Sequence, residues 1–450
     1  MTERKYAIQS KINSEAERVH YAITHMAENK AYRYAVERNG GDPEGRLLES
    51  FRERFRDYRN GWREQPRRAI DENLTGEAFA QSGMQPLCLD IEVAAVCDLA
   101  CPFCFRQYIA TPDKVISEKL YRRLIDECAR LQIPSVKLNW RGEPLLHPKL
   151  PEFIDMAKRA GVLETLINTN ATRLDETLSR ALIEAGLDQI IYSFDGGTKE
   201  TYEKMRVGRF RPNTFEKVYG NIRRFAEIRR ELGAAFPYTK IQMILTEDTF
   251  NEQDSFFALF EDCVDDVSVK AYTERGGYLP DLDEASRAEI GPILDAYGVD
   301  HNAAYWRDLN NDLYVAKDRL ACEQPYQRLI VTYDGRVSMC CYDWGSEHPV
   351  GYVDQDGFAR GNADYVKVRK AIDAGKPGFA EFMAEARMPK PHIEPPRVVQ
   401  NLREIWTGET IDAVRKHHVC GRVEDVKICK RCPFKETYDW VCIKSQVAAA

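Results

Sequence analysis

The chain has 450 residues, of which 44% are hydrophobic and 30% charged, and its formal net charge is −7. The length favours two or three domains, the apolar fraction excludes an intrinsically disordered chain, and the negative charge gives no support for general binding to nucleic acid or anionic membranes. No stretch approaches the roughly 18 consecutive apolar residues of a membrane helix, and the charged start at Met1 lacks an apolar signal core, so we expect a cytoplasmic protein. Thirteen cysteines in such a chain indicate metal binding before disulfides.

Residues 1–85 carry a helical pattern. Val19, Ile23 and Met26 recur at steps of three and four, and Asn39-Gly40-Gly41 ends the pattern. Asp42 is then the predicted N-cap of a second helix, with Pro43 at the first helical position. The apolar stripe of this second helix consists of Leu48, Phe51, Phe55, Tyr58 and Trp62. We interpret the segment as a two-helix extension that packs on the next domain.

Residues 86–275 alternate between strand and helix patterns. Six short apolar runs, at 87–93, 136–140, 166–168, 190–194, 241–245 and 267–271, are each followed by a helical stretch. This order predicts an α/β fold with parallel strands and right-handed crossovers, either an open sheet or a full or partial barrel, whose active site lies at the carboxyl ends of the strands. Residues 276–320 are expected to form a helical connection. Residues 321–450 are expected to form a cysteine-rich domain in which Pro389 to Pro396 is an extended loop.

The first cysteine cluster, Cys97-Asp-Leu-Ala-Cys101-Pro-Phe-Cys104, directly follows the first predicted strand. Its spacing allows three thiolates to converge on one metal from a short loop. A structural zinc site needs a fourth ligand, whereas the next cysteine, Cys128, falls on the apolar stripe of a helix and is expected in the core. Three thiolates without an obvious fourth favour an iron–sulfur cluster with one iron open to an outside ligand.

This loop, with the aromatic Phe103 before its last cysteine, resembles that of the radical S-adenosylmethionine (radical SAM) superfamily. The resemblance implies a partial (β/α)6 barrel and a 4Fe–4S cluster whose open iron chelates the amino and carboxylate groups of S-adenosylmethionine. It also implies reductive cleavage of that cofactor to a 5′-deoxyadenosyl radical, which abstracts a hydrogen atom from the substrate. The electron is expected from a partner such as a flavodoxin or ferredoxin.

Further segments at the strand ends match the same family in order. The segment from Trp140 to Pro144 is similar to the Gly-Gly-Glu-Pro motif that hydrogen-bonds the methionine amino group, with Arg141 in place of the first glycine. Ser193-Phe194-Asp195-Gly196 resembles the segment that holds the ribose hydroxyls, and Asn168-Thr169-Asn170 offers another polar contact. Arg206 matches an arginine that relatives point at the cofactor carboxylate, although a surface arginine on a helix is an equally good interpretation. The predicted cofactor-binding residues are therefore Phe103, Gly142, Glu143, Pro144, Asn170, Ser193, Asp195 and Arg206.

A second set of cysteines lies near the C-terminus. The sequence Tyr333-Asp-Gly-Arg-Val337 predicts a hairpin turn that brings Cys322 and Cys340 onto neighbouring strands. The two-residue spacer between Cys429 and Cys432 lets both thiolates bind one metal or cluster.

This set, together with the segment from Asn401 to Trp406, resembles the auxiliary-cluster extensions called SPASM and twitch. Only one cysteine follows the Cys-x-x-Cys pair, so the shorter twitch-like form with one auxiliary 4Fe–4S cluster fits better than the two-cluster form. The resemblance favours Cys322, Cys340, Cys429 and Cys432 as ligands, with Cys341 as a substitute for Cys340, and Cys420 and Cys442 as further candidates. A zinc site of the same four cysteines is the alternative, and His417 and His418 are expected at the surface.

Similarity to twitch relatives favours dehydrogenation or epimerisation of a sugar, aminocyclitol or nucleotide-linked carbohydrate. Similarity to SPASM relatives favours an alternative, the cross-linking, epimerisation or oxidation of a ribosomally made peptide. The helical N-terminus lacks the pattern of a winged peptide-recognition domain and mildly favours the first. A non-catalytic electron-transfer protein is a third hypothesis, which the cofactor-pocket segments argue against. The candidate hydrogen donors of an epimerase are the spare cysteines Cys263, Cys341 and Cys442.

Overall fold

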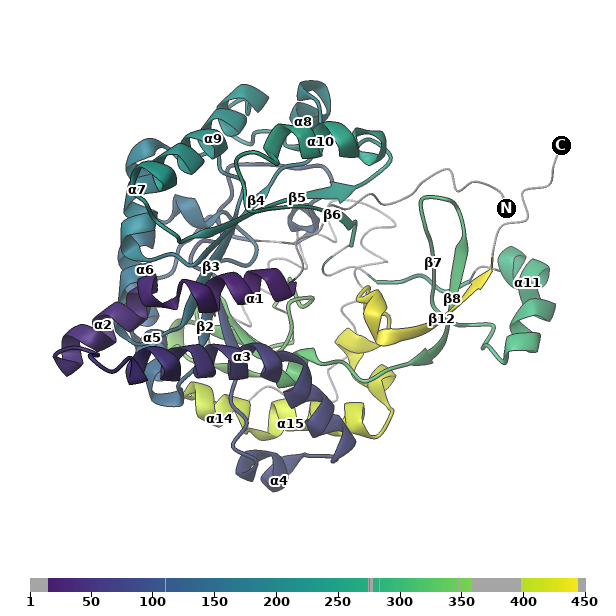
Figure 1. The fold of residues 1–450 in the computed structure, drawn as a ribbon. Coiled ribbons are helices and arrows are strands. Elements are labelled where there is room, and N and C mark those ends of the chain that lie inside the picture. The colour runs from purple at the N-terminus through teal and green to yellow at the C-terminus, as the bar shows by residue number, and fades with distance from the viewer. Residues whose placement is uncertain are drawn as a thin grey trace.

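A computed structural model describes residues 15–109, 111–273, 275, 278–282, 284–346, 348–357 and 398–443. The predicted loop from Pro389 to Pro396 lies outside these residues. Two sheets are present in the described part: a nine-stranded sheet with the order β11-β10-β9-β1-β2-β3-β4-β5-β6, and a three-stranded sheet with the order β12-β8-β7 (Figure 1). The large sheet is open, with β6 and β11 at its edges.

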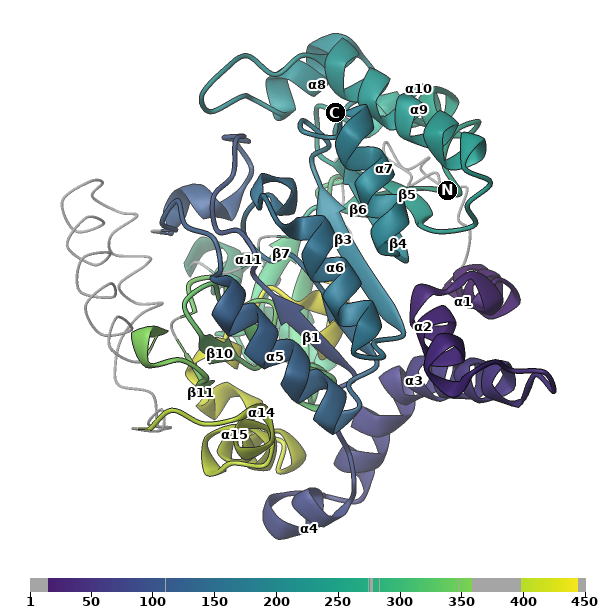
Figure 2. The ribbon, with the colours of Figure 1, turned by 90° about the vertical axis from the view of Figure 1, so that its left-hand side faces the viewer.

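The six predicted strands of the α/β region are present and are neighbours in sequence order, all parallel. They are β1 (Cys88–Ile91), β2 (Ser135–Lys137), β3 (Glu164–Thr169), β4 (Gln189–Ser193), β5 (Tyr238–Leu245) and β6 (Asp266–Ala271). The chain returns between them through α5 (Glu118–Leu131), α6 (Leu150–Arg159), α7 (Glu176–Ala185), α8 (Lys199–Met205), α9 (Phe215–Glu231) and α10 (Gln253–Phe260). Figure 2 shows α5, α6 and α7 side by side over the outer face of the sheet. The predicted partial, open form of the α/β barrel is therefore confirmed.

Each strand has one face under the helices and one toward the inside of the curved sheet. On β5, Ile241 and Met243 are fully buried beneath the helices, whereas the alternate residues Lys240, Gln242 and Ile244 are half-buried on the other face. Cys128 of α5 is buried in the same helix-covered core, as its position on the apolar stripe predicts.

The N-terminal extension contains more helices than the two predicted. They are α1 (Glu15–Thr24), α2 (Lys30–Asn39), α3 (Arg46–Asp71) and α4 (Gly76–Gln81). The predicted helix start at Pro43 is wrong by three residues, because the chain turns through Gly45 at φ 67° and α3 begins after it. Asp42 nevertheless caps the helix, since its carboxylate accepts the amide hydrogens of Leu47 and Leu48 at 3.1 and 2.9 Å.

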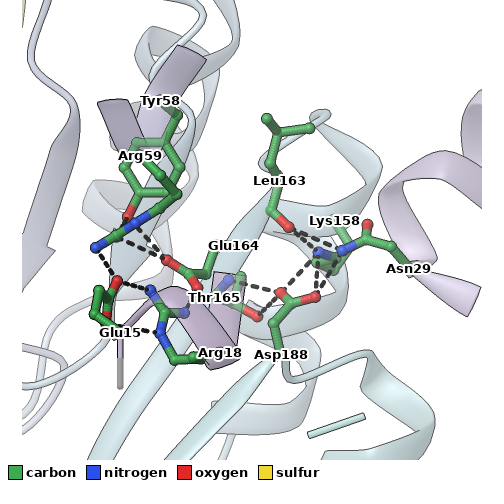
Figure 3. A network of polar contacts seen from close by, with 10 residues as sticks. All are labelled: Glu15, Arg18, Asn29, Tyr58, Arg59, Lys158, Leu163, Glu164, Thr165 and Asp188. Carbon is green, nitrogen blue, oxygen red and sulfur yellow. Dashed lines mark hydrogen bonds and ion pairs between the residues drawn. The ribbon is translucent and has the colours of Figure 1, made fainter. Parts of the chain in front are cut away.

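The extension covers the amino ends of the strands through a buried polar network (Figure 3). Glu164, the first residue of β3, pairs with Arg18 of α1 and accepts a 2.8 Å hydrogen bond from the Tyr58 hydroxyl of α3. Beside it, Asp188 pairs with Lys158 at 2.8 Å and accepts a hydrogen bond from Asn29 at 2.7 Å. These paired charges lie at the amino ends of the strands, which we call the floor of the sheet. The extension therefore closes the end of the sheet opposite to the predicted active site.

The large sheet continues past residue 321 into the C-terminal part of the chain. Strand β9 (Arg328–Val331) pairs in parallel with β1, and the antiparallel β10 (Arg336–Ser338) and β11 (Gly351–Tyr352) extend the same sheet. The predicted hairpin turn is present, with Gly335 at φ 91° where a Cβ would lie 2.5 Å from Asp354. Cys340 follows β10, but the placement of Cys322 on a neighbouring strand is wrong, because the 3-10 turn η5 (Gln324–Tyr326) separates it from β9.

Residues 276–320 are only partly helical. After α11 (Glu284–Tyr297) come β7 (Tyr305–Arg307) and β8 (Leu313–Arg319), and β8 pairs with β12 (Tyr438–Ile443) at the end of the described chain. The helical prediction missed the strand alternation in which Leu313 and Val315 are buried. Two helices, α14 (Leu402–Trp406) and α15 (Glu409–Val419), complete this region. Among the described helices, none combines the length and the apolar character needed to span a bilayer.

Candidate active site and cluster sites

The first cysteine cluster lies in the loop after β1. Cys101 is buried, and Cys97 and Cys104 are half-buried. Burial raises the pKa of Cys97 to about 12 and that of Cys101 to about 11, and each of these thiols interacts electrostatically with the next along the loop. Thiols in such surroundings become thiolate ligands when a bound metal centre supplies the compensating positive charge.

The donors that this loop offers suit a cluster better than zinc. Nowhere in the described stretches do three Cys, His, Asp or Glu side chains adopt a metal-holding arrangement as they stand. The loop itself provides three neighbouring thiols, which matches a 4Fe–4S cluster with one free iron, whereas a structural zinc site needs four ligands. The residues therefore fit the group that the resemblance implies.

Asn170 joins the cysteine loop to the end of β3. Its side-chain amide donates to Asp98 Oδ1 at 2.9 Å and lies 4.0 Å from Cys97 Sγ. Thr172 donates to the other oxygen of Asp98 at 2.6 Å. The carboxyl ends of β1 and β3 are thus linked at the cysteines.

Glu143 links the end of β2 to the same place. Its carboxylate accepts hydrogen bonds from the Thr169 hydroxyl at 2.7 Å, the Asn170 amide at 2.8 Å and the Leu145 amide at 3.0 Å. Burial raises the pKa of Glu143 to about 7, although these hydrogen bonds oppose the shift. The side chain holds two strand ends together, and its predicted contact with the methionine amino group remains a prediction.

The backbone around Glu143 explains the neighbouring residue types. A Cβ on Gly142 would lie 2.3 Å from the Ala94 carbonyl oxygen and 2.4 Å from that of Val96, so only glycine fits there. Pro144 begins the 3-10 turn η3 (Pro144–Leu146) at a position that needs no amide donor.

Arg141, which replaces the first glycine of the family motif, forms a fully buried ion pair. Its guanidinium binds both oxygens of Glu92 at 2.6 Å and donates to the Trp344 carbonyl at 3.1 Å. Trp344 follows β10, so the replacement connects the site to the C-terminal hairpin.

Arg206, at the end of α8, faces the cysteine loop rather than the surface. Its guanidinium pairs with the fully buried Asp195, lies 3.9 Å from Cys101 Sγ and stacks 5.4 Å from the ring centre of Phe103. Its Nε is buried without a hydrogen-bond partner among the described residues. An unsatisfied donor of this kind suits a carboxylate ligand.

Two other predicted cofactor residues complete this edge of the sheet. Asp195 Oδ1 accepts the Ile244 amide hydrogen at 2.7 Å, and Ser193, the last residue of β4, is half-buried. The structure thus brings the predicted residues of β1, β2, β3 and β4 to one edge, while the contact of Ser193 and Asp195 with a ribose remains a prediction.

The four favoured ligands of the second set also gather, although they come from three distant segments. Burial raises the pKa of Cys429 to about 12 and that of Cys432 to about 11. Both thiols interact electrostatically with Cys322 and with Cys340. Cys420 and Cys442, the further candidates, are exposed.

His418 is a site residue that the sequence interpretation missed. It is 2% exposed, so the surface prediction is wrong for it. Its Nδ1 accepts the Cys322 amide hydrogen at 2.9 Å, and its Nε2 lies 3.6 Å from Cys429 Sγ. The helical spacing of Ile411, Val414 and His418 on one buried face of α15 is the pattern that could have found it.

The three candidate hydrogen donors occupy different places. Cys263 precedes β6, at the amino end of the sheet, and Cys442 is exposed on β12. Cys341 is buried beside Cys340 and interacts electrostatically with Lys137 and Arg328 on the inner face of the sheet. Of these three cysteines, Cys341 lies nearest to the inside of the curved sheet.

Comparison with known proteins gives two family matches. The Radical SAM superfamily model matches residues 91–248, and the model of the iron–sulfur cluster-binding SPASM domain matches residues 322–371. The first contains all three cysteines of the loop after β1, and the second contains Cys322, Cys340 and Cys341.

Curated relatives are similar over parts of the chain. A probable GTP 3′,8-cyclase of Methanopyrus kandleri is 27% identical over 62% of this chain and 88% of its own length. The mycofactocin maturase MftC of Mycobacterium ulcerans is 26% identical over 41% of this chain and 46% of its own. Among solved structures, Streptococcus suis SuiB bound to its precursor peptide SuiA is 15% identical, with a TM-score of 0.43 over 78% of this chain and 74% of its own. Residues 91–248 are thus a Radical SAM domain and residues 322–371 a SPASM domain by their family matches, and proteins with these two domains use S-adenosylmethionine and 4Fe–4S clusters.

Proposed function

We propose that this radical SAM enzyme abstracts a hydrogen atom from a substrate held inside the curved sheet, beside the cysteine loop. The observation that supports it most is the convergence of the three-cysteine loop, Asn170 and the Asp195–Arg206 pair at the carboxyl ends of the parallel strands. The reduced cluster with S-adenosylmethionine supplies a 5′-deoxyadenosyl radical. The chain's own contribution is to hold, orient and shield the reacting groups.

In this proposal Cys97, Cys101 and Cys104 hold the cluster of the barrel. The unsatisfied Nε of Arg206 would donate a hydrogen bond to the cofactor carboxylate, and the ion pair with Asp195 would hold the guanidinium in position. Glu143 and Asn170 set the spacing between the strand ends that form the pocket.

The second set of cysteines would hold one auxiliary 4Fe–4S cluster, with Cys322, Cys340, Cys429 and Cys432 as ligands. Such a centre suits a net oxidation, because the substrate must pass an electron onward after it loses a hydrogen atom. We expect a flavodoxin or ferredoxin to reduce the barrel cluster.

For the substrate, the comparisons give more support to peptide modification than to the carbohydrate chemistry favoured by the sequence. The SPASM match and the similarity to a mycofactocin maturase favour a ribosomally made peptide as the first candidate. A polar small molecule is the second candidate, because the similarity to a probable GTP 3′,8-cyclase covers most of that relative and the inner cavity, of about 320 Å³, is of small-molecule size.

The test is anaerobic reconstitution of the full chain, followed by iron counting and measurement of 5′-deoxyadenosine release. We expect about eight irons for two clusters, and the triple variant C97A/C101A/C104A should lose about four of them and all deoxyadenosine release. Unchanged iron and release in the triple variant would contradict the barrel-cluster assignment, and four irons plus zinc in the wild type would contradict the auxiliary cluster. A short precursor-peptide gene beside this one would favour the first substrate candidate, and glycosyltransferase genes the second.

A further inference from the structure

The inner face of the curved sheet lines an open cavity of about 320 Å³, whose floor is formed by residues of the N-terminal helices α1 and α3. Lys137 of β2, Asn168 of β3, Lys240 of β5 and Lys270 of β6 line it, because alternate strand residues point to this face. Asn168 is two residues before Asn170, which contacts the cysteine loop, so along β3 the two positions are separated by only about 7 Å. The cavity therefore reaches along β3 to within two residues of Asn170, whereas the residues of the cysteine loop itself do not line it.

Away from its floor, the cavity is lined by more cationic than anionic side chains. Five cations, Lys137, Lys240, Lys270, Arg275 and Arg328, face two carboxylates, Asp90 and Asp266. Both carboxylates already have cationic partners, since Arg328 lies 3.1 Å from Asp90 and Lys240 pairs with Asp266.

Three cations remain after this pairing. The side chains of Lys137, Lys270 and Arg275 make no hydrogen bond or ion pair to any residue in the described part of the chain, and each is a lining residue of the cavity. The four charged groups of the floor, Glu15, Arg18, Arg59 and Glu164, are paired among themselves and offer no counter-charge.

The unpaired cations also repel one another. Desolvation lowers the pKa of Lys270 to about 8, and Lys240, Arg275 and Lys137 lower it further, although Lys270 and Arg275 are exposed residues at the open side of the cavity. Burial likewise lowers the pKa of Lys137, with Arg275 and Arg328 adding to the shift and Asp90 opposing it. The cavity is therefore lined by three cationic side chains that make no ion pair within the described residues and that repel one another.

We infer that this cavity is an anion-binding subsite in which Lys137, Lys270 and Arg275 bind a phosphate or carboxylate group of the substrate. The inference rests on the proposed function, because it makes the substrate of the radical reaction an anionic one. In a peptide the group would be an Asp or Glu side chain or the terminal carboxylate, and in a small molecule it would be a phosphate or a carboxylate. Lysine ammonium groups and an arginine fork bind both kinds of oxyanion.

The experiment uses the reconstituted full chain with both clusters, saturated with S-adenosylmethionine and without reductant, so that the cofactor's own carboxylate is already bound. Binding of two probes, inorganic pyrophosphate and citrate, is measured by calorimetry for the wild type, for K137Q and K270Q, and for K149Q. Lys149 is a matched control because it is exposed on the outer side of the sheet and pairs with Glu118 at 2.8 Å. Iron content and thermal unfolding verify that each variant is folded.

We expect the wild type to bind at least one probe, K137Q and K270Q to bind it at least tenfold more weakly, and K149Q to bind it as the wild type does. Tighter binding of pyrophosphate would identify a phosphate substrate, and tighter binding of citrate a carboxylate one. Absence of millimolar binding to the wild type, or equal binding by all folded variants, would overturn the inference. Deoxyadenosine release with reductant is measured separately. Release without anion binding would contradict only the anion-binding subsite. Anion binding without release would contradict only the proposed function.

Discussion

The imidazole of His418 bridges two cysteines of the second set, with Nδ1 accepting the Cys322 amide hydrogen at 2.9 Å and Nε2 lying 3.6 Å from Cys429 Sγ. Because Nδ1 accepts, the neutral ring carries its hydrogen on Nε2 and directs it at the sulfur. Hydrogen bonds to the sulfurs of an iron–sulfur cluster favour its reduced, more negative state.

The first prediction is that His418→Phe lowers the midpoint potential of the auxiliary cluster. A hydrogen bond of about 1 kcal/mol corresponds to about 40 mV for a one-electron couple. The measurement is an electrochemical titration followed by electron paramagnetic resonance. His417→Phe is the control, since His417 is partly exposed and its nearest carboxylate, Asp425, is 3.6 Å away. Equal potentials in the two variants, at unchanged iron content, would contradict the role of His418.

The second prediction concerns the Arg141–Glu92 pair. Arg141→Met leaves Glu92 buried and unpaired, so we expect the free energy of unfolding to fall by about 3–5 kcal/mol. The double variant Arg141→Met/Glu92→Gln should recover most of this loss, as measured by denaturant unfolding of the single and double variants. Arg122→Ala, which breaks an exposed pair with Glu118, should cost less than about 1 kcal/mol. A loss in Arg141→Met no larger than in Arg122→Ala would show that the buried pair does not stabilise the fold.

The third prediction separates two roles of Arg206. Arg206→Met should destabilise the fold by about 3 kcal/mol, because Asp195 loses its partner, and Arg206→Met/Asp195→Asn should restore stability. If Arg206 also binds the cofactor carboxylate, the double variant should still bind S-adenosylmethionine at least about tenfold more weakly than the wild type, even though its stability is restored. Equilibrium dialysis measures this affinity. Lys204→Met, which removes an exposed charge from the same helix, serves as the control. Recovery of both stability and affinity in the double variant would leave Arg206 with a structural role alone.

The fourth prediction is a pH dependence of anion binding. The folded pKa of Lys270, about 8, lies below its ordinary value, so the side chain is charged at pH 7 and largely neutral at pH 9. The groups that face it are Asp266 on its own strand, Lys240 on β5, Lys137 on β2 and Arg275. Anion affinity should therefore weaken about tenfold between pH 7 and 9. Measured with citrate, which is almost fully ionised at both pH values, the Lys270→Arg variant should show a much smaller change than the wild type, and a wild-type affinity independent of pH would contradict the assignment.

The sequence predicts the six parallel strands and the cysteine loop well, because strand alternation and close cysteine spacing are local patterns. It does not predict that β9 joins β1, since that pairing links residues separated by some 240 positions and no local pattern encodes it. The strands of residues 305–319 were missed for a related reason: β8 is held by β12, at the far end of the described chain.

The candidate site likewise contains residues that a sequence pattern predicts and residues that only the tertiary structure places. Arg206 could be placed only by its match to a family pattern, and the structure was needed to show that it faces Cys101. His418 was expected at the surface because two adjacent histidines on a helix give no indication of which one faces inward. The lysines inside the sheet are isolated in sequence, and only the assembled strands bring Lys137 and Lys270 into one cavity.

The pairing of β9 with β1 has a consequence for how such an enzyme can evolve. A chain cut before β9 would leave the backbone amides and carbonyls of β1 along an open margin, ready to associate with other chains. The α/β region and the C-terminal part are therefore not independent modules that could be exchanged separately between proteins. The proposed barrel cluster and the proposed auxiliary cluster would thus be held next to strands of one shared sheet.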